Sequence, residues 1–269
     1  MNLIKVNEMN LQQLTDEVNN IYFNDTSSYK TIASKQKELL AIVGASTDIK
    51  KINRELILKY FNTLKRIGNK ANTINSKMAY LSKILTYAVA NRLIDFKPVI
   101  PYIKEKHTKT KIIKPDEYTM MLDYTIQNKL TELNQVIIIG YNTGMRISNI
   151  LAMQADDIEN NYIRIYNNKT NNPYSIPINK NLQELLKDFK GFTLNYRQIQ
   201  YQFQTMIKRL NLDSRITIHT LRHTTCTRLV EKGIAIPTIQ KIMNHKNINT
   251  TMQYTHISDE QLEQAVAVL

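Results

Sequence analysis

Residues 162–178 read YIRIYNNKTNNPYSIPI, and they carry the clearest β signal in the chain. Residues 162–166 alternate apolar and polar side chains as a half-buried strand does, and residues 174–178 follow in the same way. Four asparagines and Pro173 lie between the two runs and favour a turn. The stretch therefore predicts an antiparallel β-hairpin with Lys169 near its tip.

Helical spacing dominates the sequence on both sides of the hairpin. In residues 10–95, apolar side chains recur three and four positions apart, in one stripe of Leu56, Ile57, Tyr60, Phe61 and Leu64 and another of Ile74, Met78, Leu81, Ile84 and Leu85. Further helices are expected at about 116–127, 131–142, 181–189, 196–210, 220–232, 237–244 and 250–256. The expected fold class is mainly α, with a small antiparallel β-sheet or hairpin in the second domain.

A basic segment separates the two helical regions. Residues 101–115, PYIKEKHTKTKIIKP, carry five lysines and one glutamate and lack an apolar helical stripe. We predict a helical domain at 1–100, a linker at 101–115, a second domain at 116–258 and a tail at 259–269. The linker is compatible with a solvated tether and, equally, with a basic strap along a phosphate backbone. In the second case the DNA-binding residues are Lys104, Lys106, Lys109, Lys111 and Lys114.

The composition favours a nucleic-acid partner and an intracellular location. A formal net charge of +13 attracts polyanions, and no basic amphipathic stretch with Trp and Phe on its other face points to a lipid surface. Neither a run of about eighteen apolar residues nor a signal-peptide stretch occurs, so we expect a cytoplasmic protein without a membrane anchor. Cys226 is the only cysteine, which excludes a disulfide framework and favours a buried apolar role.

Two arginines and a histidine are candidate phosphate ligands. Arg146 and Arg222 each fall in the expected first turn of a helix, where the helix dipole disfavours a cation. One such arginine is usually a surface ion pair, but two favour a phosphate held between guanidinium groups. His219 would share the face of Arg222, three residues on, whereas His223 would point elsewhere. The spacing of the two histidines also fits a metal pair, but Thr220 stands where a metalloprotease motif has Glu, so no metal is expected.

Tyr254 is a candidate nucleophile. It lies nine residues after His245, in a segment where Thr250 or Thr251 can cap a short helix. Because the chain has fifteen tyrosines, one alone is a weak candidate. A phenol ionises near pH 10, so this tyrosine would need a base or a strong positive field to attack phosphorus.

Four short motifs occur in a fixed order along the chain. They are Thr143-Gly144-Met145-Arg146-Ile147-Ser148, Asn168-Lys169-Thr170, His219-Thr220-Leu221-Arg222-His223, and NHKNINTTMQYTH at residues 244–256. In this order they resemble the catalytic signature of the tyrosine recombinase (phage integrase) family, over roughly residues 112–258. The preceding helical segment resembles the family's core-binding domain, which forms a C-shaped clamp around DNA with the catalytic domain.

The resemblance implies a site-specific DNA strand transferase that works through a Holliday junction. Tyr254 would form a 3′-phosphotyrosyl bond and release a 5′-hydroxyl, while both arginines and His245 bind the non-bridging oxygens. Lys169 would protonate the departing oxygen, and His219 would assist proton transfer at the tyrosine. The implied catalytic set is Arg146, Lys169, His219, Arg222, His245 and Tyr254.

The resemblance also implies partners. They are double-stranded DNA with inverted-repeat sites, further copies of the chain that form a tetramer on DNA from a free monomer or weak dimer, and accessory DNA-bending proteins. The phosphotyrosyl ester conserves the bond energy, so no cofactor is expected. The expected location is the nucleoid of a prokaryotic cell or of the host of a phage or other mobile element.

Two positions depart from the family pattern. Asn149 stands where members commonly carry Glu or Asp, which leaves the support of the active site open. Asn244 stands where they commonly have Gly, but Asn also adopts the left-handed conformation. The adjacent Asp156 and Asp157 are compatible with a two-metal nuclease, although a solvated cap is favoured.

Two other functions remain open at this point. A type IB topoisomerase uses a similar set of residues, and a relative without catalysis would only bind DNA; the six filled positions disfavour the latter. The tail favours the recombinase. Ser258 and Gln261 fit a capping box, and an apolar stripe follows that would dock on its own domain or on a neighbouring protomer. The stripe consists of Leu262, Ala265, Val266 and Leu269.

Overall fold

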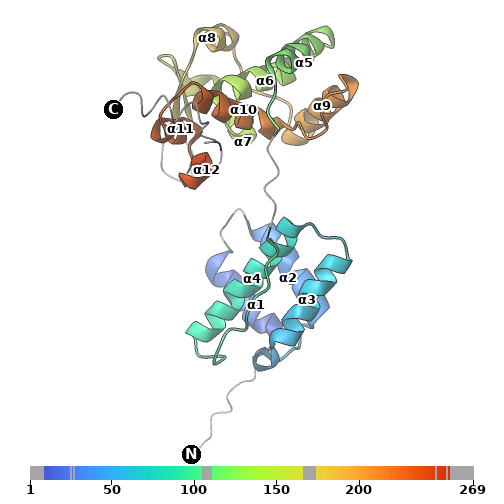
Figure 1. The fold of residues 1–269 in the computed structure, drawn as a ribbon. Helices are drawn as coiled ribbons and strands as arrows, with labels where there is room; N and C mark the ends of the chain where they lie inside the picture. The colour runs from blue at the N-terminus through green and yellow to red at the C-terminus, as the bar shows by residue number, and fades with distance from the viewer. Residues whose placement is uncertain are drawn as a thin grey trace, which may run out of the picture. The chain divides into compact units, whose positions relative to one another are not determined.

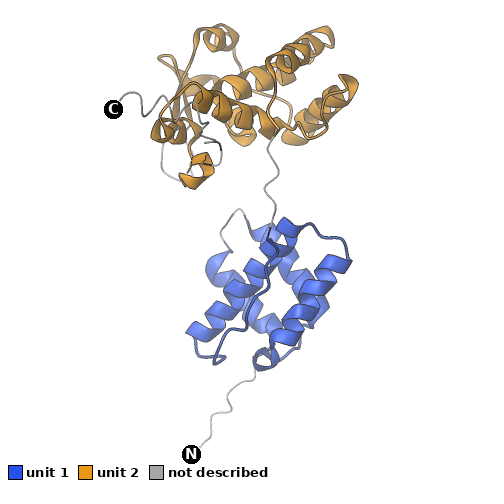
Figure 2. Cartoon of the chain, in the orientation of Figure 1, with its two compact units in different colours: residues 1–108 blue, residues 109–269 orange. Residues whose placement is uncertain are grey.

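The computed structural model describes residues 9–24, 26, 28–104, 111–165, 174–245, 247–252 and 254. The chain divides into two compact units, residues 1–108 and 109–269, each with a core of its own (Figure 2). No helix in these described segments is long and apolar enough to span a membrane.

The first unit is helical. Its elements are α1 (Leu11–Tyr22), α2 (Tyr29–Val43), the 3₁₀ helix η1 (Ile49–Lys51), α3 (Arg54–Arg66) and α4 (Ala71–Ala90) (Figure 1). A capping box starts α1, because the Asn10 side chain accepts from the Gln13 N–H at 2.9 Å and the Gln13 side chain accepts from the Asn10 N–H at 3.0 Å. The two predicted apolar stripes are confirmed as the core faces of α3 and α4, although Leu56 is only partly buried.

The second unit is also mainly helical. Its helices are α5 (Pro115–Gln127), α6 (Thr131–Thr143), α7 (Ile147–Leu151), the 3₁₀ helix η2 (Ala155–Asp157), α8 (Lys180–Leu186), α9 (Tyr196–Arg209), α10 (Ile218–Glu231), α11 (Ile236–Met243) and α12 (Asn249–Met252). Helix α10 packs against both α6 and α11, and α11 packs against α12 (Figure 1). Helix α10 therefore joins the helices that carry the candidate site.

A small antiparallel sheet with strand order β1-β2-β3 completes the second unit. The predicted hairpin is confirmed: β2 (Tyr162–Ile165) pairs with β3 (Tyr174–Pro177), with Ile163 opposite Ile176 and both side chains buried. The two-residue strand β1 (Ile158–Glu159) was not predicted, because it is too short to show an alternating pattern. Lys169 lies outside the described residues.

Helix α10 begins at Ile218, two residues earlier than the sequence predicted. Thr217 and Thr220 cause this start, because the Thr217 N–H donates to the Thr220 hydroxyl at 2.9 Å in a capping box. Arg222 is consequently the fifth residue of the helix and not part of its first turn. At the other end of the unit, Ile113 of the expected linker is buried, and its N–H donates to the Thr224 hydroxyl of α10 at 2.9 Å.

Candidate active site

Two left-handed residues frame the site at the ends of α6 and α11. Gly144 ends α6 with φ of 66°, and Asn244 ends α11 with φ of 48°. Asn244 thus adopts the conformation for which it was predicted to replace glycine. An added Cβ at Gly144 would also lie 2.6 Å from the Met243 Cε, so the buried Met243 side chain would have to shift. The close approach brings the two helix ends together.

Arg222 is buried between these helix ends. Its Nη1 donates to the Gly144 carbonyl at 2.7 Å, and its Nη2 donates to the Met243 carbonyl. Carbonyl groups at helix C-termini carry partial negative charge, so they compensate the buried guanidinium. The arginine is therefore fixed by backbone groups of two different helices.

Arg146 binds the next carbonyl of the same segment. It is the exposed N-cap residue of α7, and its two Nη atoms each donate to the Asn244 carbonyl at 3.2 Å. Arg222 and Arg146 thus bind two consecutive carbonyls, those of Met243 and Asn244 respectively. A planar fork of donors at each position suits the recognition of a phosphate.

His223 contacts Tyr254, contrary to the expectation that its ring would point elsewhere. The His223 Nδ1 is hydrogen-bonded to the Tyr254 hydroxyl, and the two ring centroids are 5.5 Å apart. His219 stands edge-on to His223, with 4.6 Å between ring centroids. The expectation was wrong because His219 and His223 are four residues apart and therefore share a helix face. From the sequence, this spacing had been considered only as a possible pair of metal ligands.

His245 is buried and fixed by its neighbours. Its Nδ1 is hydrogen-bonded to the Thr251 hydroxyl at 2.8 Å, and its backbone exchanges hydrogen bonds with Gln240, each of 3.0 Å. Thr250 or Thr251 was expected as a helix cap, but both lie inside α12, and the Asn247 side chain accepts from the N–H of its first residue, Asn249, at 2.9 Å. The Thr251 hydroxyl instead orients the histidine.

Tyr254 packs its ring against a small apolar cluster of Cys226, Ile239 and Met243. Cys226 is buried as predicted. Burial, and secondarily Cys226, raise the pKa of the Tyr254 phenol to about 12, while Arg222 opposes the rise. The hydroxyl therefore keeps its proton at neutral pH while no substrate is bound.

The histidines are held neutral. Burial, then His219 and Arg222, lower the pKa of His223 to about 4. Burial, then the two arginines, lower the pKa of His245 to about 4 as well, and the pKa of His219 is lowered for the same reasons. A neutral imidazole offers one donor and one acceptor nitrogen, so each ring can give one proton and accept another.

The remaining predicted residues are the linker lysines and the adjacent aspartates. Lys106 and Lys109 are not described. Lys104 and Lys114 are exposed, and Lys111 forms an ion pair of 3.4 Å with Glu117. The Asp157 side chain accepts from the Gln154 N–H at 2.8 Å, and no three His, Cys, Asp or Glu side chains gather as metal ligands within the described segments.

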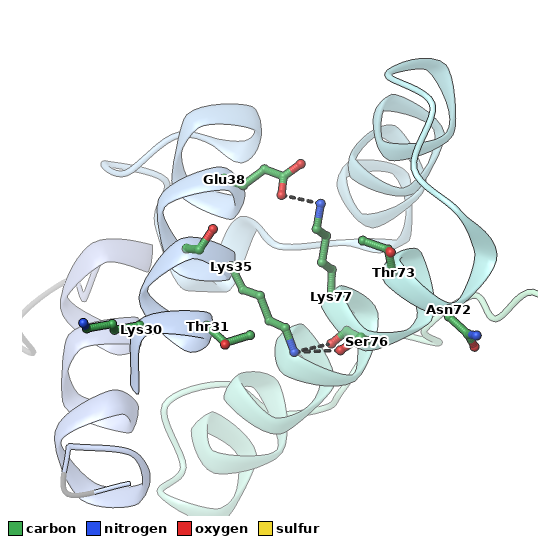
Figure 3. Close-up of a pocket in the computed structure, with 9 residues that line it drawn as sticks. Lys30, Thr31, Lys35, Glu38, Asn72, Thr73, Ser76 and Lys77 are labelled. Carbon is green, nitrogen blue, oxygen red and sulfur yellow. Dashed lines mark hydrogen bonds and ion pairs between the residues drawn. The ribbon is translucent and has the colours of Figure 1, made fainter. Parts of the chain in front are cut away.

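The first unit contains a cationic cleft that the sequence did not reveal (Figure 3). It has a volume of about 620 Å³ and lies between α2 and α4, where the two helices face each other with lysines and hydroxyl groups. The Lys35 Nζ donates to the Ser76 Oγ at 2.7 Å, and Lys77 pairs with Glu38 at 2.5 Å. Burial, and secondarily Lys77, lower the pKa of Lys35. The sequence signal that could have indicated this cleft is the spacing of lysine and hydroxyl residues about one helical turn apart on α2 and on α4.

Comparison with known proteins identifies the family. Residues 111–261 match the Phage integrase family. The chain belongs to this family. It is 26% identical over 224 residues to the integrase of Escherichia phage P2, covering 81% of this chain and 65% of that protein. It is 23% identical over 283 residues to the tyrosine recombinase XerC of Pediococcus pentosaceus, covering 94% and 92%.

Solved structures of integrases share the fold. The Tn1549 transposon integrase in complex with a circular intermediate DNA matches with a TM-score of 0.82 at 20% identity, covering 97% of this chain and all of that one. A phage lambda integrase tetramer bound to a Holliday junction matches with a TM-score of 0.72 at 18% identity, covering 93% and 78%. The structural likenesses confirm the predicted fold, mainly helical with a small sheet. Family membership confirms the predicted function: the chain is a DNA breaking and rejoining enzyme of site-specific recombination.

Proposed function

We propose that Tyr254 attacks a DNA phosphate at a specific site and forms a covalent 3′-phosphotyrosyl bond. The observation that carries this proposal is the attachment of both arginines to the carbonyls of Met243 and Asn244, at the start of the segment that ends in Tyr254. Guanidinium groups and phenol are therefore held by one short stretch of chain. A phosphate bound by the arginines would lie beside the nucleophile.

The arginines and His245 would stabilise the charge that builds on the non-bridging oxygens. The Thr251 hydroxyl can donate to the His245 Nδ1, which places the remaining ring proton on Nε2. This N–H would then donate to the phosphate. Each donor of this kind contributes on the order of a hundredfold to the rate.

Lys169 would act as the general acid for the departing 5′-oxygen. It belongs to the segment between β2 and β3, whose paired residues Ile165 and Tyr174 hold the two ends of that segment together. An ammonium group on such a connection can reach the leaving oxygen while the sheet stays in place.

The first unit and the linker lysines would bind the DNA together with the second unit, which carries Tyr254. Supports for this proposal are the net charge of +13 and the cleft formed by Lys30, Lys35 and the hydroxyls of α4. We extend it to inverted-repeat sites, a homo-tetramer on DNA, accessory DNA-bending proteins and association with the nucleoid. The lambda integrase tetramer bound to a Holliday junction is the precedent for this assembly.

A covalent trap tests this function. Inverted repeats of about a dozen base pairs, a typical half-site length, are first sought in the DNA that flanks the gene. A nicked DNA substrate is then built from these repeats. The wild-type protein should form a denaturant-resistant adduct that peptide mapping places on Tyr254, and Tyr254→Phe should bind the DNA without forming it. An adduct with the Phe variant, or at another residue, would remove Tyr254 from this role. Relaxation of a supercoiled plasmid that lacks the repeats would favour a type IB topoisomerase.

A further inference from the structure

His223 lies outside the catalytic set that the family resemblance implies, yet it is the residue that contacts the reactive atom. Among the described residues, its Nδ1 is the side-chain group hydrogen-bonded to the Tyr254 hydroxyl. His219, which the resemblance assigns to this task, contacts the ring of His223. His223 therefore lies between His219 and Tyr254 and contacts both side chains.

We propose that His223 accepts the phenolic proton of Tyr254 during strand cleavage and returns it during rejoining. This role rests on the proposed function of Tyr254 as the nucleophile. As the Tyr254 oxygen bonds to phosphorus, its proton moves to the His223 Nδ1, the bond from phosphorus to the 5′-oxygen breaks, and that oxygen takes a proton from Lys169. In the reverse step an incoming 5′-hydroxyl attacks phosphorus and gives its proton to Lys169, while the departing tyrosine regains its proton from His223.

The surroundings of His223 suit a base that becomes active only on DNA. Arg222 and His219 lie beside it on α10, while Tyr254 and His245 face it from the segment after α11. Burial, then His219 and Arg222, lower the pKa of His223 to about 4, so its Nδ1 lone pair carries no proton but is a weak base for the phenol before DNA binds. A bound phosphate would neutralise the arginines and favour the imidazolium that forms. Without DNA, the proton stays on the phenol.

The test compares two phenols at position 254. One enzyme carries tyrosine, and the other carries a polyfluorinated tyrosine acidic enough to be ionised at the assay pH despite the rise in pKa that burial causes at this position. With tyrosine, His223→Gln should slow adduct formation at least a hundredfold, because a general base contributes about 10² to 10⁴, while DNA affinity is unchanged. With the fluorinated tyrosine, the same substitution should slow it less than about fivefold, because the phenolate already exists.

His219→Gln is the matched control, one helical turn earlier on α10. Its loss should be the same with both phenols, because it does not contact the tyrosine hydroxyl. Equal losses for His223→Gln with both phenols would overturn the proposal, and so would a loss for His219→Gln that disappears with the fluorinated tyrosine. If His223→Gln fails to bind DNA, His223→Asn serves in its place under the same criteria. Failure of the wild-type protein to form an adduct on Tyr254 would instead overturn the proposed function itself.

Discussion

Arg222 donates a hydrogen bond of 2.7 Å to the Gly144 carbonyl, and this bond fixes a buried charge at the end of α6. A second bond to the Met243 carbonyl ties the same side chain to α11. One residue thus ties two helix ends together and, under the proposed function, would also position the phosphate. Substitution should therefore affect stability and catalysis together.

Arg222→Lys should destabilise the second unit and abolish most activity. Lysine keeps the charge but cannot bridge two carbonyls as a planar fork does, and an unpaired buried acceptor costs about 1–3 kcal/mol. Adduct formation should fall at least about a hundredfold. Urea unfolding and single-turnover cleavage measure the two effects.

Arg164→Lys in β2 is the control for this substitution. Arg164 is partly exposed and its ion pair with Glu159 is 3.4 Å long, so the change should stay within about 0.5 kcal/mol. A stability loss at position 222 no larger than that at 164 would show that the buried bridge contributes nothing.

Gly144→Ala should destabilise the second unit by about 2–4 kcal/mol, because a left-handed alanine is strained and its Cβ would displace Met243. Gly233→Ala separates the two causes. Gly233 has a similar φ of 70° with nothing within 4 Å of the added Cβ, so only the strain of about 1 kcal/mol remains. Chemical denaturation compares the variants, and equal losses at both positions would deny the contact with Met243.

The predictable parts of this fold are those with a local signal. The stripes of α3 and α4 and the alternation of β2 follow directly from side-chain spacing. The contact between His223 and Tyr254 could not be predicted, because it depends on the packing of α10 against α11 and of α11 against α12. Likewise, a threonine at position 251 is compatible with capping a helix and with a hydrogen bond to His245. Only the tertiary structure shows that it makes the hydrogen bond.

At DNA concentrations well below saturation, where the rate reports the free protein, adduct formation should be nearly constant from about pH 6 to pH 9 and fall as the pH approaches 4. The pKa of His223 lies at about 4, below its ordinary 6.5, so the base form persists throughout that range and is lost only when acid protonates the ring. His223→Gln should instead gain about tenfold per pH unit, since the reaction then depends on hydroxide and the pKa of Tyr254 is about 12. A flat profile for the variant would contradict this account. Single-turnover kinetics across the range provide the measurement, with DNA binding checked at each pH.

Lys169→Ala should stall cleavage of ordinary DNA but not of DNA whose bridging 5′-oxygen is replaced by sulfur. A thiolate leaves without a proton, so the loss of a general acid no longer matters. The variant should lose at least about a hundredfold on the oxygen substrate and less than about fivefold on the sulfur substrate. His223→Gln provides the contrast, because its defect should persist on both. Equal defects of Lys169→Ala on the two substrates would remove Lys169 from the acid role.

A fragment of residues 109–269 tests whether both units grip the DNA. The fragment keeps its own core, including Ile113 and its hydrogen bond to Thr224, so it should fold alone. A shorter fragment of residues 115–269 lacks that anchor and should be less stable, which makes it the control for folding. The longer fragment should bind DNA at least about tenfold more weakly than the whole chain. It should also show a shallower dependence of log Kd on log salt, because each lost phosphate contact removes about 0.9 from the slope. Equal affinity and slope for fragment and whole chain, measured by fluorescence anisotropy, would assign DNA binding to the catalytic unit alone.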